Sequence, residues 1–320
     1  MSDAPKESVG IFQKIKTILE MIRFSHTIFA LPFALLSAVM CWTVPPLESV
    51  DLDLPGFRSI HLLGIVVCMV FARSAAMAFN RAADHQIDKD NPRTQNRHIP
   101  AGKLSLKSVV VFTFINSILF VAATLLFLPN RLPVYLSVPV LGFLCLYSYT
   151  KRFTSLAHFY LGVSLMLAPV STWIALRGEV VMVSPADCLP AVLIGLIVLF
   201  WVGGFDIIYA CQDAAFDKAA KLKSVPAKLG VKAALRVAAL SHLVMIGCML
   251  LLPQVHHAGG PVLALGWIYY TAVAAVSILL IYEHSMVTAE DLNRVNIAFF
   301  NVNSVISVGL FLIVSLDLLI

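Results

Sequence analysis

Two acidic segments stand out in this chain because each follows directly on a long apolar run. The first reads NRAADHQID, from Asn80 to Asp88, and the second reads DIIYACQDAAFD, from Asp206 to Asp217. On an α-helix, steps of four and seven residues keep side chains on one face, so each segment presents a narrow stripe of carboxylates. Such carboxylates repel one another and, near a low-dielectric medium, favour the protonated form unless a cation is bound. The spacing therefore predicts a cation site.

The most suitable cation is Mg²⁺, which takes oxygen ligands and is typically held by one or two carboxylates together with substrate phosphates. Two such stripes at one surface would bind a diphosphate through Mg²⁺, while nearby lysines and arginines take the remaining charge. Extending the first stripe backwards reaches Arg73, seven residues earlier and about 10 Å deeper along the helix. A charged residue within an apolar segment is a functional candidate. Pro92 predicts that the first helix ends by Asn91.

The rest of the chain predicts a polytopic membrane protein. Hydrophobic residues make up 59% of the sequence and the mean hydropathy is +0.88. Apolar stretches of about twenty residues recur along the chain, and each is long enough to cross a bilayer. We expect nine spans, at residues 24–43, 60–80, 108–128, 134–149, 155–176, 190–211, 234–252, 261–282 and 296–320.

Lysines and arginines predict the orientation, since loops rich in them stay cytoplasmic. With the N-terminus inside, most of the 23 basic residues lie in inner segments, and the outer loops hold only Arg58, Arg131 and Arg177. Apolar residues at helical spacing over 11–23 predict an interfacial helix within a cytoplasmic segment, 1–23. The net charge of +5 follows from this topology, so we expect a lipid bilayer as partner and no nucleic acid.

The motifs N-R-x-x-D-x-x-x-D and D-x-x-Y-A-x-x-D-x-x-x-D resemble the two signatures of the UbiA superfamily of membrane aromatic prenyltransferases. The resemblance extends over nearly the whole chain, through IRFSHTIFALPFAL, NPRTQNRHIPAG, YSYTKR and KSVPAKLG. Arg81 stands where the family more often has Asp. That departure fits the branch that is similar to 4-hydroxybenzoate polyprenyltransferases and to a related enzyme of menaquinone biosynthesis.

This resemblance implies an all-α fold: a single domain over 1–320 with nine transmembrane helices, a central cavity and helical cytoplasmic cap loops. It implies Mg²⁺-dependent transfer from a polyprenyl diphosphate to an aromatic acid, in ubiquinone or menaquinone biosynthesis, at a bacterial inner membrane. The acceptor expected is 4-hydroxybenzoate, with a dihydroxynaphthoate as the alternative. The implied metal ligands are Asn80, Asp84, Asp88, Asp213 and Asp217.

Further site residues are carried over from the same resemblance. The four aspartates among the metal ligands are also expected to be catalytic, as is Asp206 beside the acceptor. The implied substrate-binding residues are Arg23, Arg73, Asn80, Lys151, Arg152 and Tyr209.

Two other classes fit parts of the pattern. A secondary transporter also carries charges within many spans, but it would place them near the midplane. A membrane alcohol-phosphate transferase also has clustered aspartates, but this chain lacks the D-G-x-x-A-R pattern that is typical of such enzymes.

Overall fold

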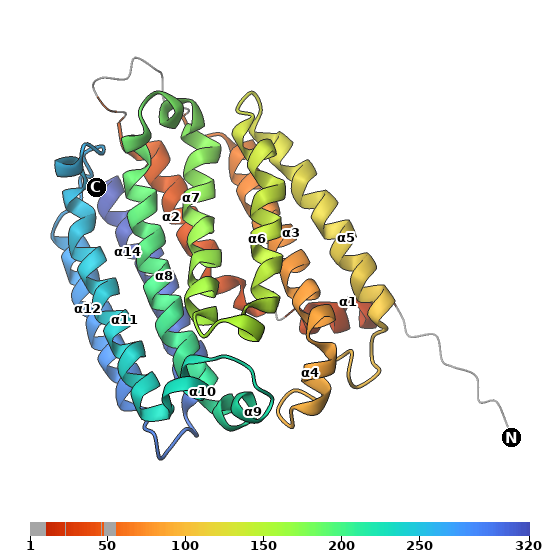
Figure 1. Cartoon of the computed structure of the whole chain (residues 1–320). Coiled ribbons are helices and arrows are strands. Elements are labelled where there is room, and N and C mark those ends of the chain that lie inside the picture. The colour runs from red at the N-terminus through yellow and green to blue at the C-terminus, as the bar shows by residue number, and fades with distance from the viewer. Residues whose placement is uncertain (1–10, 23, 46, 48–55) are drawn as a thin grey trace, which may run out of the picture.

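The structure is a computed structural model that describes residues 11–22, 24–45, 47 and 56–320 (Figure 1). All regular elements in these ranges are helices, and no strand occurs among them. The long helices are α2 (Leu31–Thr43), α3 (Ser59–Ala83), α5 (Leu106–Ala123), α6 (Leu132–Phe153), α7 (Ala157–Val183), α8 (Leu189–Ala210), α11 (Val231–Leu251), α12 (Trp267–Ser285) and α14 (Asn303–Leu319). The short helices are α1 (Ile11–Met21), α4 (His85–Asp90), α9 (Ala214–Ala219), α10 (Val225–Leu229) and α13 (Val295–Ile297).

Tighter or wider helical turns join several of these helices. They are the 3₁₀ segments η1 (Phe24–Phe29), η2 (Thr124–Phe127), η3 (Pro185–Cys188), η4 (Cys211–Asp213) and η5 (Leu252–Ala258), and the π-helical segment η6 (Ala298–Val302). The all-α class predicted for the chain is therefore confirmed.

The long helices run side by side as one bundle (Figure 1). Helix α7 packs along α8, α8 along α11, and α3 along α5, while α2 packs against α7 and α14. The main core lies where α2, α7, α8, α11, α12 and α14 meet, and Trp173 and Trp201 are fully buried within it. Helix α1 ends at the buried residue Met21, and Met21 and the following Ile22 pack with residues of α3 and α5.

Eight helical segments in the described ranges are long and apolar enough to cross a membrane. They correspond to eight of the nine predicted spans. The first predicted span, 24–43, is a 3₁₀ segment followed by a shorter apolar helix, so that the apolar helical part covers Thr27–Thr43. Many large apolar side chains point outward from the bundle; for example, Phe114 is 66% exposed and Trp267 is 75% exposed. Such a surface suits lipid as its solvent. The chain is thus a multi-pass membrane protein.

Helix α7 corrects one detail of the predicted topology. Its helical turns continue to Val183, beyond the predicted end at 176, and Arg177, with φ −122° and ψ 21°, forms a kink between two helical stretches instead of lying in a loop. Arg177 is 1% exposed and its guanidinium forms hydrogen bonds of 2.9 and 2.5 Å to the buried carboxylate of Asp187. It also donates to the carbonyl of Val44, 2.7 Å away. Arg177 therefore connects α7 to η3 and to the residue that follows α2, at the end of the bundle opposite the acidic loops.

The acidic loops share the other end of the bundle. Helices α4, α9 and α10 gather there, and the C-terminus lies at the opposite end (Figure 1). The two helices that lead into the acidic loops end before the loop aspartates. The expectation that each acidic stripe lies on one unbroken helix is therefore wrong. Helix α3 ends at Ala83, and α8 ends at Ala210.

Candidate active site

Each acidic stripe is broken at its D-x-x-x-D aspartate nearest the membrane span. Asp84 separates α3 from α4 with φ −99° and ψ 6°, and Asp213 ends η4 directly before α9 with φ −100° and ψ 3°. Both residues are the N-caps of the short helices that follow, yet neither side chain caps its helix. The same local geometry thus occurs in both loops, and it leaves both carboxylates available for other partners.

The carboxylate of Asp84 lies between an amide and an arginine. The Asn80 side-chain amide donates to one Asp84 oxygen over 2.9 Å, and Arg152 donates to the other over 3.2 Å. Arg152 also donates to the carbonyl of Ala83 over 2.8 Å, which fixes its guanidinium at the break in the helix. Burial raises the pKa of Asp84 above its usual value, and the hydrogen bond from Arg152 opposes that shift.

The carboxylate of Asp88 pairs with an arginine from its own loop. Arg97 donates to one oxygen over 2.6 Å, and the Thr94 hydroxyl donates to the Asp88 backbone carbonyl over 3.1 Å. Asp88 is 5% exposed, and its second carboxylate oxygen is buried without a hydrogen-bond partner. A buried charged oxygen in this state is costly, so Asp88 is suited to accept a further cation or donor.

Asp213 connects the second loop to the first. The guanidinium of Arg93 contacts both Asp213 oxygens, through Nε at 2.7 Å and through a second, shorter bond from Nη2. Asn91 adds a bond of 3.3 Å to the same carboxylate, and Arg93 also donates to the Tyr209 hydroxyl over 2.9 Å. The two predicted loops are therefore in direct contact.

Asp217 completes the set. It is 3% exposed, and Lys151 lies 3.9 Å from its Oδ2 atom, which has no hydrogen-bond partner. Lys151 and Arg152 occupy the last turn of α6, so this helix serves one aspartate of each loop. Each predicted metal-binding carboxylate thus has its own basic partner: Asp84 has Arg152, Asp88 has Arg97, Asp213 has Arg93 and Asp217 has Lys151.

Asp206 lies apart from these four pairs. Its carboxylate is 2.7 Å from Nδ1 of His158, whose side chain is fully buried. The backbone N–H of Val225 donates to Nε2 of the same ring over 3.4 Å, so the ring proton sits on Nδ1 and is donated to Asp206. His158 therefore joins α7 to α8 and to the start of α10.

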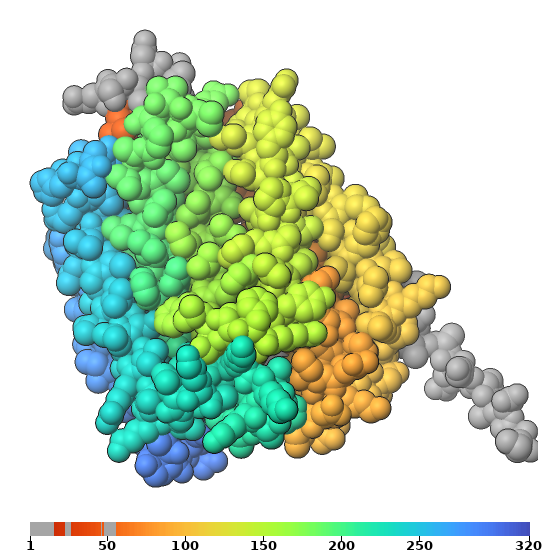
Figure 2. Space-filling view, viewed as in Figure 1, coloured from red at the N-terminus to blue at the C-terminus, as the bar shows by residue number. Residues whose placement is uncertain are grey.

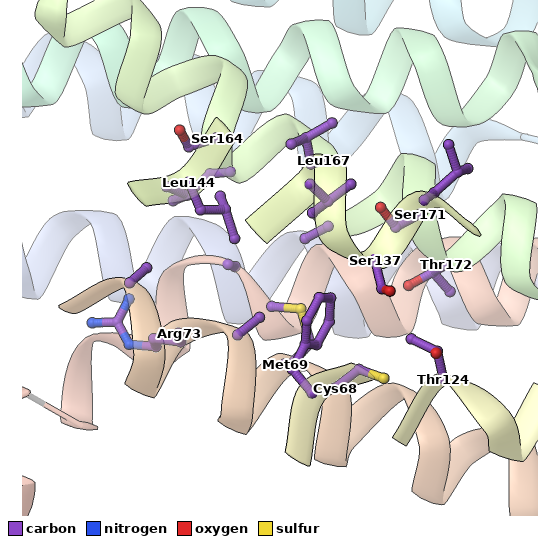
Figure 3. A pocket seen from close by; sticks show the side chains of 18 of the residues that line it. Cys68, Met69, Arg73, Thr124, Ser137, Leu144, Ser164, Leu167, Ser171 and Thr172 are labelled. Carbon is purple, nitrogen blue, oxygen red and sulfur yellow. The ribbon is translucent and has the colours of Figure 1, made fainter. Parts of the chain in front are cut away.

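An apolar cavity of about 200 Å³ lies between α3, α5, α6 and α7. Arg73, Asn80 and Tyr147 line it toward the acidic loops, and Figure 3 places Arg73 at one end and Ser137, Thr124 and Thr172 at the other. The hydroxyls of Ser137 and Thr124 donate to carbonyls of their own helices, so they leave the wall apolar.

The predicted site residues fall into three groups. The structure brings together Asn80, Tyr209, Lys151, Arg152 and the four aspartates of the D-x-x-x-D pairs. It places Arg73 in the cavity, and Asp206 with His158. Arg23 lies outside the described residues.

The sequence did not predict three residues that contact the aspartates: Arg93, Arg97 and His158. Both arginines stand in the quoted motif NPRTQNRHIPAG directly after the first acidic stripe, and this nearness in the sequence was the only indication of their role. His158 gave no signal in the sequence, because its partners are 48 and 67 residues away.

The donor set suits Mg²⁺, although the carboxylates are not gathered around one point. In the part of the chain that the structure describes, no three His, Cys, Asp or Glu side chains are grouped closely enough to hold a metal ion. The candidate ligands are nevertheless all oxygens, and Asp88 and Asp217 each have an oxygen without a hydrogen-bond partner. These features fit the hard cation, and binding requires the basic partners to move aside.

Comparisons with known proteins bear on the family and the fold of the chain. The model of the UbiA prenyltransferase family matches residues 30–305. The 4-hydroxybenzoate octaprenyltransferase of Nitrosomonas europaea is 30% identical over 251 residues, which cover 78% of each chain. The enzyme of the same name from Vibrio atlanticus is 27% identical over 274 residues, or 84% of this chain and 90% of the other.

Solved structures show the same architecture. A UbiA homolog from Aeropyrum pernix, in an apo structure, superposes with a TM-score of 0.74 at 29% identity, covering 92% of this chain and 97% of the other. A UbiA homolog from Archaeoglobus fulgidus, bound to GPP and Mg²⁺, has a TM-score of 0.64 at 16% identity, covering 95% and 100%. The family model spans most of the sequence, and the chain belongs to the UbiA prenyltransferase family.

Proposed function

We propose that this prenyltransferase moves a polyprenyl group from an allylic polyprenyl diphosphate to 4-hydroxybenzoate, in quinone biosynthesis. The observation that carries the proposal is the set of four carboxylates at one end of the bundle, each paired with a basic side chain, together with an apolar cavity whose lining includes Asn80, a hydrogen-bond partner of Asp84. A diphosphate with Mg²⁺ satisfies both partners of each pair: the aspartates bind the metal, and the basic residues bind the phosphate oxygens.

The metal would be held by Asn80, Asp84 and Asp88 from one loop and by Asp213 and Asp217 from the other. When bound, Mg²⁺ supplies charge neutralisation for the departing diphosphate. The released guanidinium groups of Arg93, Arg97 and Arg152 and the ammonium of Lys151 then stabilise the negative charge that develops as the C1–O bond breaks. The relatives named as 4-hydroxybenzoate octaprenyltransferases and the GPP- and Mg²⁺-bound homolog support this assignment.

The cavity suits the prenyl chain. Its wall follows α3 from Ile65 to Asn80, a length of about 22 Å at the helical rise per residue. The wall is apolar and excludes water. Water would otherwise react with the allylic cation. Tyr147 lines the cavity beside Asn80, where an aromatic face can stabilise positive charge on C1.

The aromatic acid would bind with its carboxylate toward Arg73. This guanidinium lies in a cavity with otherwise mostly apolar lining, and a bidentate pair with a carboxylate is its strongest interaction. The ring carbon next to the hydroxyl then attacks C1, and we assign removal of the ring proton to Asp206, held by His158. Tyr209 would hold Arg93 toward the substrate. A dihydroxynaphthoate is the second candidate acceptor, because it offers the same carboxylate and a phenolic ring.

Cellular placement follows from the charge distribution. We propose a single domain over 1–320 in the bacterial inner membrane, with the N-terminus and the acidic loops in the cytoplasm. Helix α1 would then lie at the cytoplasmic surface.

The test uses membranes that contain the protein, geranyl diphosphate, Mg²⁺ and one acceptor at a time, with products identified by mass. We expect a prenylated 4-hydroxybenzoate that disappears with a chelator and in Asp84→Asn and Asp213→Asn, each of which should still insert in the membrane. Asp90→Asn is the matched control, because Asp90 is an exposed acid of the same loop.

Product formation that survives chelation or either site variant would contradict the metal-dependent mechanism. Product from a dihydroxynaphthoate alone would reassign the acceptor and leave the mechanism intact.

A further inference from the structure

A second hollow lies on the surface beside the active-site loops. It has a volume of about 500 Å³ and lies between the α6–α7 junction and the segment that joins α9 to α10. Phe153, Thr154 and Ser155 form one wall, and Lys218, Lys221, Lys223 and Lys228 contribute to the others. In Figure 2 the yellow-green atoms of the junction face the viewer directly above the teal atoms of the second loop.

The hollow is strongly basic and lacks counter-charges. All four lysines are exposed, and among the described residues none of them forms an ion pair. The nearest acid in sequence, Asp217, is buried and faces Lys151 instead. Four like charges around one hollow repel one another, so the arrangement is stabilised by an anion.

The walls of the hollow are fixed to each other. The backbone N–H of Lys223 donates to the carbonyl of Lys151 over 2.7 Å, and its side-chain ammonium donates to the carbonyl of Phe153 over 3.1 Å. The basic segment is therefore attached to the end of α6, and its lysines are held near the exposed apolar residues of the α6–α7 junction.

Large apolar side chains are exposed at the hollow and next to it in the sequence. Phe153, which lines the hollow, is 55% exposed, and Leu156 and Leu229, which directly follow the lining residues Ser155 and Lys228, are 60% and 51% exposed. These residues lie at or just beyond the ends of membrane-spanning or apolar helices, which is the depth of the lipid headgroups. An anion that carries acyl chains matches both features, whereas a free phosphate matches only the lysines.

We propose that this hollow binds the phosphate headgroup of an anionic phospholipid from the adjacent leaflet. The lysines contact the phosphate, and Phe153, Leu156 and Leu229 contact the start of the acyl chains. The bound lipid neutralises the positive charge of the lysines in the loop that also carries Asp213 and Asp217. The proposal does not depend on the acceptor or on the reaction assigned above.

The test titrates phosphatidylglycerol into the delipidated full-length protein and counts bound lipids by native mass spectrometry. We expect the wild-type protein to retain phosphatidylglycerol in preference to phosphatidylcholine. The double variant Lys221→Gln/Lys228→Gln should bind it about 30-fold more weakly, since each lysine near a membrane surface contributes a separate attraction. Lys221→Arg/Lys228→Arg should restore the binding.

The matched control is Lys103→Gln/Lys107→Gln, which removes two exposed lysines from the first loop and should change the affinity by less than about 3-fold. Equal binding by the wild-type protein and the Lys221/Lys228 variant would overturn the proposal. So would displacement of the lipid by millimolar inorganic phosphate, because the ligand would then be a free anion. Displacement by geranyl diphosphate would instead make the hollow part of the substrate site, and it would also overturn the proposal.

Discussion

Arg93 offers the sharpest test of how the acidic loops work, because its guanidinium occupies the Asp213 carboxylate that we assign to the metal. If the two cations compete for this carboxylate, removing Arg93 must strengthen metal binding in the absence of substrate. The same change must weaken turnover, because the diphosphate loses a cation. Arg93→Gln is therefore expected to move two measurements in opposite directions.

The size of the effect follows from the contacts. Arg93 makes two hydrogen bonds to Asp213, and the side chains are 30% and 8% exposed, respectively. Charge-assisted bonds contribute about 1.5–3 kcal/mol each when buried, but solvent reduces exposed ion pairs to about 1 kcal/mol or less. A net competition of about 1.5 kcal/mol corresponds to about 10-fold tighter metal binding in the variant.

The assay measures Mn²⁺ binding to the purified protein without diphosphate, by calorimetry or electron paramagnetic resonance. Lys89→Gln is the control, because it removes an exposed charge from the same loop without touching Asp213, and it should change the affinity by less than about 3-fold. Turnover of geranyl diphosphate by Arg93→Gln should fall by about 100-fold. Mn²⁺ affinity that stays equal or weakens in Arg93→Gln would refute the competition.

Three further changes test other parts of the structure. Arg177→Ala should lower the free energy of unfolding by about 3–5 kcal/mol, because Asp187 stays buried without its partner, while the KM of the folded enzyme for geranyl diphosphate stays unchanged; an unaltered thermal midpoint would contradict the buried pair. His158→Ala should lower kcat and change KM much less. His158→Gln, which keeps a donor for Asp206, should recover part of the lost kcat; equal turnover by the wild-type protein and both variants would exclude a positioning role. Thr172→Trp should fill the far end of the cavity and shift preference toward shorter prenyl diphosphates in competition assays; an unchanged product distribution would place the prenyl chain elsewhere.

Hydropathy predicted most of the fold because apolar runs long enough for a bilayer are unambiguous. It was wrong where helix ends depend on tertiary contacts. Arg177 was placed in a loop because an arginine ends an apolar run, yet the bundle buries it beside Asp187, which lies 10 residues away. The first span was predicted to be longer than the helix, since apolar composition does not distinguish a 3₁₀ segment from an α-helix.

The sequence predicted which residues form the site, but it did not predict which of them contact one another. Helical spacing brought Asp84 and Asp88 to one side, and the membrane topology brought the two loops to one end. Spacing did not reveal the break at Asp84, because no proline or glycine marks it. The pairing of Arg93 with Asp213 depends on the approach of segments 120 residues apart, which periodicity within one segment does not describe.

The uncapped starts of α4 and α9 have a consequence for engineering. An aspartate at this position commonly stabilises its helix by about 1 kcal/mol through a bond to the backbone, and Asp84 and Asp213 both forgo it. Exchanging either residue therefore removes no helix-capping bond, so inactive variants should remain well folded. Such variants would serve as stable reference proteins that show how much of the binding of the diphosphate depends on the metal.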